Sequence, residues 1–162
     1  MKSTVIRHEQ LSPLQHQQLL EIELLSEQKT LVGDAYGAVH TLTARPACDI
    51  QGYVLLIEDV PVGFFLLKRR SLLPRWADGP TATLHALMID RRYQGLGLGR
   101  TCVGMLPGLV RGFWPDIEQL MLAVDLGNLP ARALYQSLGW QECGDADRTR
   151  TGFERRMVLS LG

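Results

Sequence analysis

A turn with three glycines in five positions carries the clearest chemical signal in this sequence. Gly95, Gly97 and Gly99 lie between an apolar segment that predicts a strand and a helix expected to begin near Arg100. Glycine lets the backbone turn tightly with its amides pointing inward, and the start of a helix adds partial positive charge. Backbone of this kind binds anions, and a pyrophosphate has the matching charge. The turn therefore predicts a pyrophosphate site.

Other interpretations of this turn compete. The phosphate-binding loop of P-loop proteins needs a longer spacing between its glycines, followed by Lys and then Ser or Thr, and the turn has neither. The dinucleotide fingerprint reads G-x-G-x-x-G, whereas this turn reads G-x-G-x-G. A turn that is only flexible does not account for the flanking Arg91, Arg92 and Arg100. A nucleotide-binding domain and a purely structural turn are therefore the weaker interpretations.

One histidine lies in the strand expected to lead into the turn. The pattern predicts a strand over residues 81–90, in which alternation places Thr83, His85, Leu87 and Ile89 on one face. Imidazole has an ordinary pKa suited to proton transfer at neutral pH, so His85 is a candidate general base. The alternative is a core histidine bonded to a backbone carbonyl. The other three histidines show no metal-ligand spacing.

The strands that would position these groups follow from apolar runs bounded by turn residues. The sequence predicts seven of them, over residues 4–7, 53–58, 62–68, 81–90, 120–124, 140–143 and 153–159. The short turn after residue 58 predicts an antiparallel hairpin. The order strand, helix, strand after residue 81 predicts a parallel pair with a right-handed crossover.

The helices are predicted from their caps. Ser12 and Gln15 form a capping box for a first helix, whose apolar face is expected to include Leu14, Leu19, Ile22 and Leu25. Residues 29–51 have a weak pattern that predicts at most one short helix. A later helix is capped by Asn128 and ends at Gly139. Pro107 should kink the helix that follows the glycine turn, or end it early.

Composition and charge restrict the class of protein. A chain of 162 residues with 46% hydrophobic residues predicts one folded domain over residues 1–162 rather than a disordered segment. Seventeen basic residues balance seventeen acidic ones, so no global field attracts nucleic acid or an anionic membrane. Cys48, Cys102 and Cys143 match no zinc spacing, and we expect reduced thiols and no metal. No signal peptide or membrane-spanning stretch is recognisable, which predicts a cytoplasmic location.

Two blocks of sequence point together to one family. Residues 91–100 read RRYQGLGLGR, and residues 128–140 read NLPARALYQSLGW. The first block resembles the Q/R-x-x-G-x-G/A loop of the GNAT acyl-CoA-dependent N-acyltransferases, and the second resembles the N-x-x-A-x-x-L-Y-x-x-x-G-F/W segment of the same family. With the closing strand at residues 154–159, the resemblance covers nearly the whole chain.

The resemblance implies a fold and a donor substrate. The fold would be an α/β mixed sheet of about seven strands, flanked by helices and opened between the strands at 81–90 and 120–124, with acetyl-CoA in the opening. Backbone groups of Met88 and Ile89 would pair with the pantetheine arm, and Asn128 would contact it. The pyrophosphate would be bound at Gln94, Gly95, Leu96, Gly97, Leu98, Gly99 and Arg100. No metal is implied.

The resemblance also implies catalytic residues. An alkyl amine with a pKa of about 10 is neutral only about a thousandth of the time at pH 7, so a base should matter. The segment around His85 is similar to the strand of arylalkylamine N-acetyltransferases, in which a histidine helps to deprotonate the amine, although Thr83 replaces that branch's second histidine. Tyr135, at the tyrosine of the family's helix motif, would be the general acid near the CoA sulfur. For Tyr135 the alternative is a packing role.

The implied function is transfer of an acetyl group from acetyl-CoA to a primary amine of a small molecule or peptide. The rival, from a different class, is a catalytically idle acyl-CoA-binding module on the same fold. We expect no nucleic acid or membrane partner, and the sequence allows a homodimer. Arg92 and Arg132 are candidates for contact with the CoA phosphates, against the alternative of ordinary solvated arginines. The acceptor would be bound by the variable segments 25–51, 144–152 and the loop around Trp76.

Overall fold

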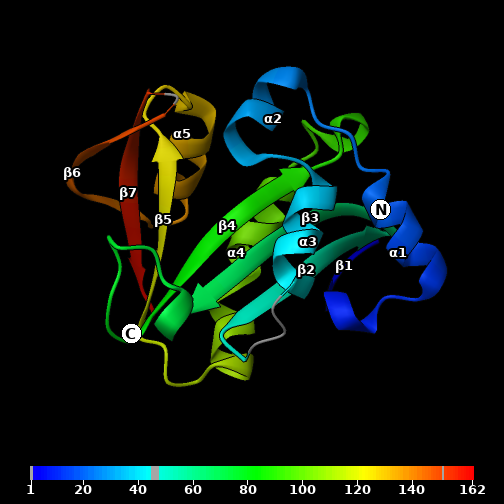
Figure 1. Cartoon of the computed structure of the whole chain (residues 1–162), viewed down its shortest axis with the longest axis horizontal. Coiled ribbons are helices and arrows are strands. Elements are labelled where there is room, and N and C mark those ends of the chain that lie inside the picture. The colour runs from blue at the N-terminus through cyan, green and yellow to red at the C-terminus, as the bar shows by residue number, and fades with distance from the viewer. Residues whose placement is uncertain (1, 45–47, 151) are drawn as a thin grey trace. The chain divides into compact units, whose positions relative to one another are not determined.

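Seven strands form a single mixed sheet in the computed structural model, which describes residues 2–44, 48–150 and 152–162 (Figure 1). The strand order is β1-β2-β3-β4-β5-β7-β6. The strands are β1 (Ser3–Arg7), β2 (Ile50–Ile57), β3 (Val60–Arg69), β4 (Thr81–Ile89), β5 (Gln119–Asp125), β6 (Gln141–Thr149) and β7 (Gly152–Ser160). The helices are α1 (Pro13–Leu20), α2 (Ser26–Val32), α3 (Ala35–Ala44), α4 (Leu98–Phe113) and α5 (Leu129–Ser137). This architecture confirms the predicted fold class.

The chain divides into two compact units. The first unit combines Met1–Lys68 with Leu84–Cys102, and the second combines Arg69–Thr83 with Val103–Gly162. Strand β4 and helix α4 each contribute residues to both units. The prediction of one domain over the whole chain stays a prediction.

The centre of the first unit is the β2–β3 hairpin. Every residue of β2 is buried, and Phe64 and Phe65 of β3 are fully enclosed. Tyr53 lies opposite Phe65 in the antiparallel register, and their rings stack at 5.2 Å. Glu58 and Asp59 connect the strands with φ angles of 48° and 66°, which is the backbone of a tight hairpin turn. Helix α3 crosses the side of this hairpin that faces the viewer in Figure 1.

Local cap chemistry explains α1, and the segment after it differs from prediction. The Ser12 hydroxyl accepts from the Gln15 N–H at 3.1 Å and the Gln15 side chain accepts from the Ser12 N–H at 3.0 Å, which confirms the capping box. Leu19 is fully buried, but Leu14 is 63% exposed and Leu25 is 40% exposed, so the predicted apolar face was wrong at these two positions. The helix ends at Leu20, so Ile22, which is buried, and Leu25 lie beyond it. Two helices, α2 and α3, occupy the stretch that predicted at most one.

The second unit is built around β5. Thr81–Thr83 of β4 pair with it in parallel, and β7 pairs with it antiparallel along its whole length. The strand predicted over residues 140–143 is longer in the structure, because β6 continues through the variable segment to Thr149 with a register shift between Cys143 and Asp147. Such a bulge bends a strand without ending its pairing.

Helix α4 does not end early at Pro107. It runs unbroken from Leu98 to Phe113, although proline cannot donate the usual backbone hydrogen bond. Val103, Leu106 and Val110 on the buried face of this helix are each 1% exposed. Their burial stabilises the helix beyond the proline, because packing of an apolar face outweighs one missing hydrogen bond.

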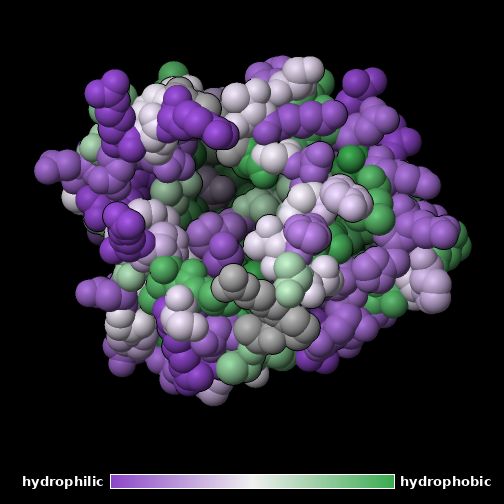
Figure 2. Space-filling model, viewed as in Figure 1, coloured by the Kyte–Doolittle hydropathy of each residue, from purple (hydrophilic) through white to green (hydrophobic). Residues whose placement is uncertain are grey.

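Hydrophilic residues cover most of the face in Figure 2, and hydrophobic residues show as smaller separate areas. Within the part of the chain that the structure describes, no helix has the length and apolar character needed to cross a membrane.

Candidate active site

The glycine turn has the backbone that an anion site requires. Gly95 and Gly97 have φ angles of 78° and 79°, in the left-handed region that side chains disfavour. A Cβ placed on either residue would meet no atom within 4 Å, so the space beyond the turn is open. Both glycines and Leu96 between them are exposed. A ligand can therefore approach the backbone of the turn directly.

The start of α4 adds donors to this turn. The Gly97 carbonyl accepts the first helical hydrogen bond, from the Thr101 N–H at 3.1 Å. The N–H groups of Leu98 and Gly99 come before that bond, and the first N–H groups of a helix have no acceptor within the helix itself. They carry the positive end of the helix dipole, which attracts anions.

The strand that leads into the turn is not regular. Ala86 has a φ of 55°, which is uncommon for a residue with a side chain and interrupts the alternation predicted for β4. Met88 beyond it is buried, and Ile89 lies against β3, where its Cδ1 fills the space beside Gly63. A positive φ does not occur in regular strand backbone, so β4 is irregular just before the turn.

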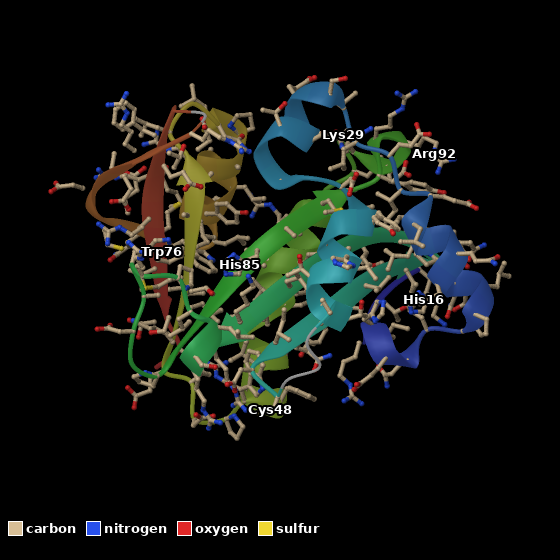
Figure 3. The ribbon with its side chains drawn as sticks, viewed as in Figure 1. His16, Lys29, Cys48, Trp76, His85 and Arg92 are labelled. Atoms are coloured by element: carbon tan, nitrogen blue, oxygen red, sulfur yellow. The ribbon has the colours of Figure 1, made fainter. Side chains whose placement is uncertain are left out.

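His85 lies on β4 next to this irregularity (Figure 3). Burial, and secondly the positive charge of Lys68, lower the pKa of His85 from 6.5 to about 4. The imidazole is therefore neutral at physiological pH and has a lone pair for accepting a proton. Its low basicity means that it accepts a proton only from a strongly acidic donor.

Tyr135 lies in the second unit, on α5. Its side chain is buried against Trp140, with ring centroids 5.8 Å apart. Burial raises the pKa of Tyr135 to about 12. The phenol is thus protonated over the whole working pH range.

Asn128 and Arg132 lie near the start of the same helix. The Asn128 side-chain oxygen caps α5 by accepting from the Ala131 N–H at 3.3 Å, which leaves Nδ2 as its group for a ligand. Arg132 donates to Glu142 at 3.0 Å and to the Leu126 carbonyl at 2.9 Å. Because these contacts hold its guanidinium, the structure does not favour Arg132 as a free cation for a phosphate.

Sequence reasoning missed Asp90, which directly follows β4. Its side chain is 2% exposed and accepts hydrogen bonds from both the backbone and the guanidinium of Arg92. Arg92 is therefore also engaged within the protein rather than held free for a ligand. The signal was present as an Asp immediately before a short turn, a position where this side chain often caps backbone N–H groups.

Each unit thus gathers part of the predicted site. The first unit holds His85, Met88 and Ile89 in direct sequence with the glycine turn, and the second holds Asn128 and Tyr135 on α5. Across the described ranges, no group of three or more His, Cys, Asp or Glu side chains is arranged to bind a metal ion.

Curated relatives of the chain are acetyltransferases. An uncharacterized N-acetyltransferase of Bacillus subtilis is 32% identical over 93 residues, which cover 56% of this chain and 58% of that protein. A mycothiol acetyltransferase of Thermobispora bispora is 36% identical over 91 residues, covering 49% of this chain and 30% of that protein. The chain therefore spans less than two thirds of the length of either relative.

Solved structures extend the likeness to the whole fold. The spermidine N-acetyltransferase of Vibrio cholerae, in complex with CoA and spermine, superposes with a TM-score of 0.71 over 98% of this chain and 95% of that one, at 15% identity. A sequence profile of the acetyltransferase (GNAT) family matches residues 17–140, which include β4, the glycine turn and α5. The profile match, the curated relatives and the fold all agree, and the chain belongs to the acetyltransferase (GNAT) family.

Proposed function

We propose that this protein is an enzyme that transfers an acetyl group from acetyl-CoA to a primary amine. The observation that carries the proposal is the open glycine turn. Gly95 and Gly97 adopt left-handed backbone with free space beyond them, directly before the first N–H groups of α4. This is a cradle for a pyrophosphate, and CoA contains one.

The donor would be bound mainly by backbone. The amides of residues 94–100 bind the pyrophosphate, and backbone groups at Met88 and Ile89 pair with the pantetheine amides. Asn128 donates from Nδ2, since its oxygen already caps α5. Acetyl-CoA supplies the activated thioester, and the protein supplies position and proton transfer.

Two side chains assist the proposed reaction, one at the amine and one at the departing sulfur. The neutral amine attacks the thioester carbonyl, a C–N bond forms, and the C–S bond breaks. His85 accepts the proton that the nitrogen loses, directly or through water; its low pKa suits a nitrogen that bond formation has already made acidic. The Tyr135 hydroxyl donates a hydrogen bond to the departing thiolate. His85 releases the accepted proton to solvent and the thiolate takes one up from solvent, so CoA leaves as the thiol and both side chains return to their starting state.

The acceptor is proposed as a primary amine on a small molecule or a peptide. The relative from Bacillus subtilis and the structural neighbour from Vibrio cholerae are both named N-acetyltransferases, which supports an amine acceptor without choosing one. The segments expected to bind the acceptor include α2 and α3 of the first unit.

A thiol-release assay with acetyl-CoA and a panel of amines tests the proposal, together with calorimetry of CoA binding. We expect measurable CoA affinity and turnover on at least one amine. CoA binding without turnover on any amine would favour the idle acyl-CoA-binding module. No binding of CoA would overturn both.

A further inference from the structure

Asp90 is a buried carboxylate with four hydrogen-bond donors around it. Its Oδ1 accepts from the Arg92 N–H and Nε, both at 2.9 Å, and its Oδ2 accepts from Arg92 Nη2 at 3.0 Å and from the Glu23 N–H at 3.2 Å. Burial alone would raise the pKa of this carboxyl, but the donors from Arg92 and Glu23 outweigh it and hold the pKa below its ordinary value. The group is therefore a carboxylate at neutral pH.

These contacts join two segments that are distant in sequence. Glu23 lies between α1 and α2, and its carbonyl accepts from the Arg91 N–H at 2.7 Å while its own N–H donates to Asp90. A second tie lies a few residues further on. The Gln28 and Gln94 side chains donate to each other at 3.1 and 2.8 Å, and Gln94 also donates to the Ile89 carbonyl at 2.9 Å. Residues 23–28 are thus fastened to the first residues of the glycine turn.

We propose that Asp90 is a positioning residue of the donor site, which couples residues 23–28 to the glycine turn. The inference rests on the proposed function, because it assumes that the turn binds CoA. The Asp90 side chain is hydrogen-bonded to Glu23 and Arg92, which lie outside the proposed cradle of residues 94–100. It fixes where the chain enters the turn, and so where the amides from Gln94 onward point.

The coupling between the turn and residues 23–28 can be measured from either side. If binding of CoA holds the turn still, the ties at Glu23 and Gln28 transmit that restraint to the start of α2. Conversely, when the ties are broken the turn can adopt other conformations. Part of the binding free energy of CoA is then used to restore the binding conformation of the turn.

Two variants break the two ties separately. Asp90→Asn keeps the shape of the side chain but presents an NH2 group to the surrounding donors. Gln28→Leu removes the amide pair with Gln94, together with the cap that the Gln28 oxygen forms on the Leu25 N–H, and changes no residue of the turn. We expect Asp90→Asn to weaken CoA binding about 10- to 100-fold and Gln28→Leu about 3- to 10-fold, measured by calorimetry. KM for acetyl-CoA should rise accordingly, with kcat within about threefold of wild type. The matched control is Asp116→Asn in the second unit, an aspartate paired with Arg69 and Arg70, which should leave CoA affinity unchanged.

Hydrogen exchange separates positioning from general destabilisation. In the wild type, CoA should slow amide exchange both in the turn and at residues 23–28. In Asp90→Asn, saturating CoA should still slow exchange in the turn, but the protection at Glu23 should be lost, because its N–H donates to Asp90. Wild-type affinity in Asp90→Asn, or protection that never reaches residues 23–28, would overturn the inference while leaving the proposed function intact. If Asp90→Asn does not fold, Gln28→Leu decides, and wild-type affinity in that variant overturns the coupling. Failure of the wild type to bind CoA would instead overturn the proposed function, and the inference with it.

Discussion

Tyr135→Phe removes one hydroxyl and keeps the ring that packs against Trp140. The pKa of Tyr135 is raised to about 12. Complete proton transfer to a thiolate whose conjugate acid has a pKa of about 8.5 is therefore uphill by about 5 kcal/mol. The hydroxyl is thus expected to act by hydrogen bonding to the sulfur as negative charge develops on it. A hydrogen bond to a charged group contributes about 1.5–3 kcal/mol, so kcat should fall about 10- to 150-fold.

The assay is thiol release under single-turnover conditions, so that chemistry and not product release is measured. Acetyl-CoA affinity should stay unchanged, and Tyr53→Phe, which deletes another buried hydroxyl in the first unit, serves as the control. The raised pKa also moves the ionisation of Tyr135 out of the working range, so it should cause no decline in activity between about pH 7 and pH 10. A wild-type rate in Tyr135→Phe, with chemistry limiting, would refute the assignment.

Three further changes test other parts of the molecule. Gly97→Asp should abolish acetyl-CoA binding in calorimetry, with a normal circular dichroism spectrum. The control is Gly79→Asp, at an equally open position with positive φ. Each substitution should lower the free energy of unfolding by about 1–2 kcal/mol, but Gly79→Asp should leave binding intact. His85→Ala should lower the rate about 100-fold at pH 7 and less at pH 9.5, and an equal loss at both would argue for packing alone. The pKa of His85 is about 4 in the folded protein, so as the pH falls the unfolded chain takes up this proton at a higher pH than the folded protein does. Denaturant titrations should therefore show the stability of the wild type falling between pH 6.5 and pH 4 more steeply than that of His85→Ala. Pro107→Ala should restore a helical hydrogen bond and raise stability by up to about 3 kcal/mol, and an unchanged urea midpoint would contradict this.

Features set by neighbouring residues could be predicted from the sequence. The capping box of Ser12 and Gln15 needs only a spacing of three residues, and the glycine turn needs only its own glycines and the helix that follows. The positions of the strands along the chain and the hairpin of β2 and β3 could be predicted for the same reason, since apolar runs and short turns report the local backbone. The roles of His85 and Tyr135 stay predictions.

Features that depend on distant partners could not be predicted. The alternation assumed for β4 fails at Ala86, a residue that gives no local sign of a positive φ. Asp90 is buried because Glu23, 67 residues away, meets it in the fold, and no spacing rule connects the two. Helix α4 continues past Pro107 because its apolar face is buried, which outweighs the local preference to stop.

The glycine turn uses backbone amides as its proposed binding groups, and this has a consequence for how the protein can change over generations. Substitution of a side chain leaves the amide beneath it in place, so most mutations within the turn do not remove a donor. Only Gly95 and Gly97, where the φ angle is positive, restrict the choice of residue strongly. Such a donor site tolerates drift in most of its own sequence, and the chain can acquire new acceptors elsewhere while the same two glycines continue to hold the same donor.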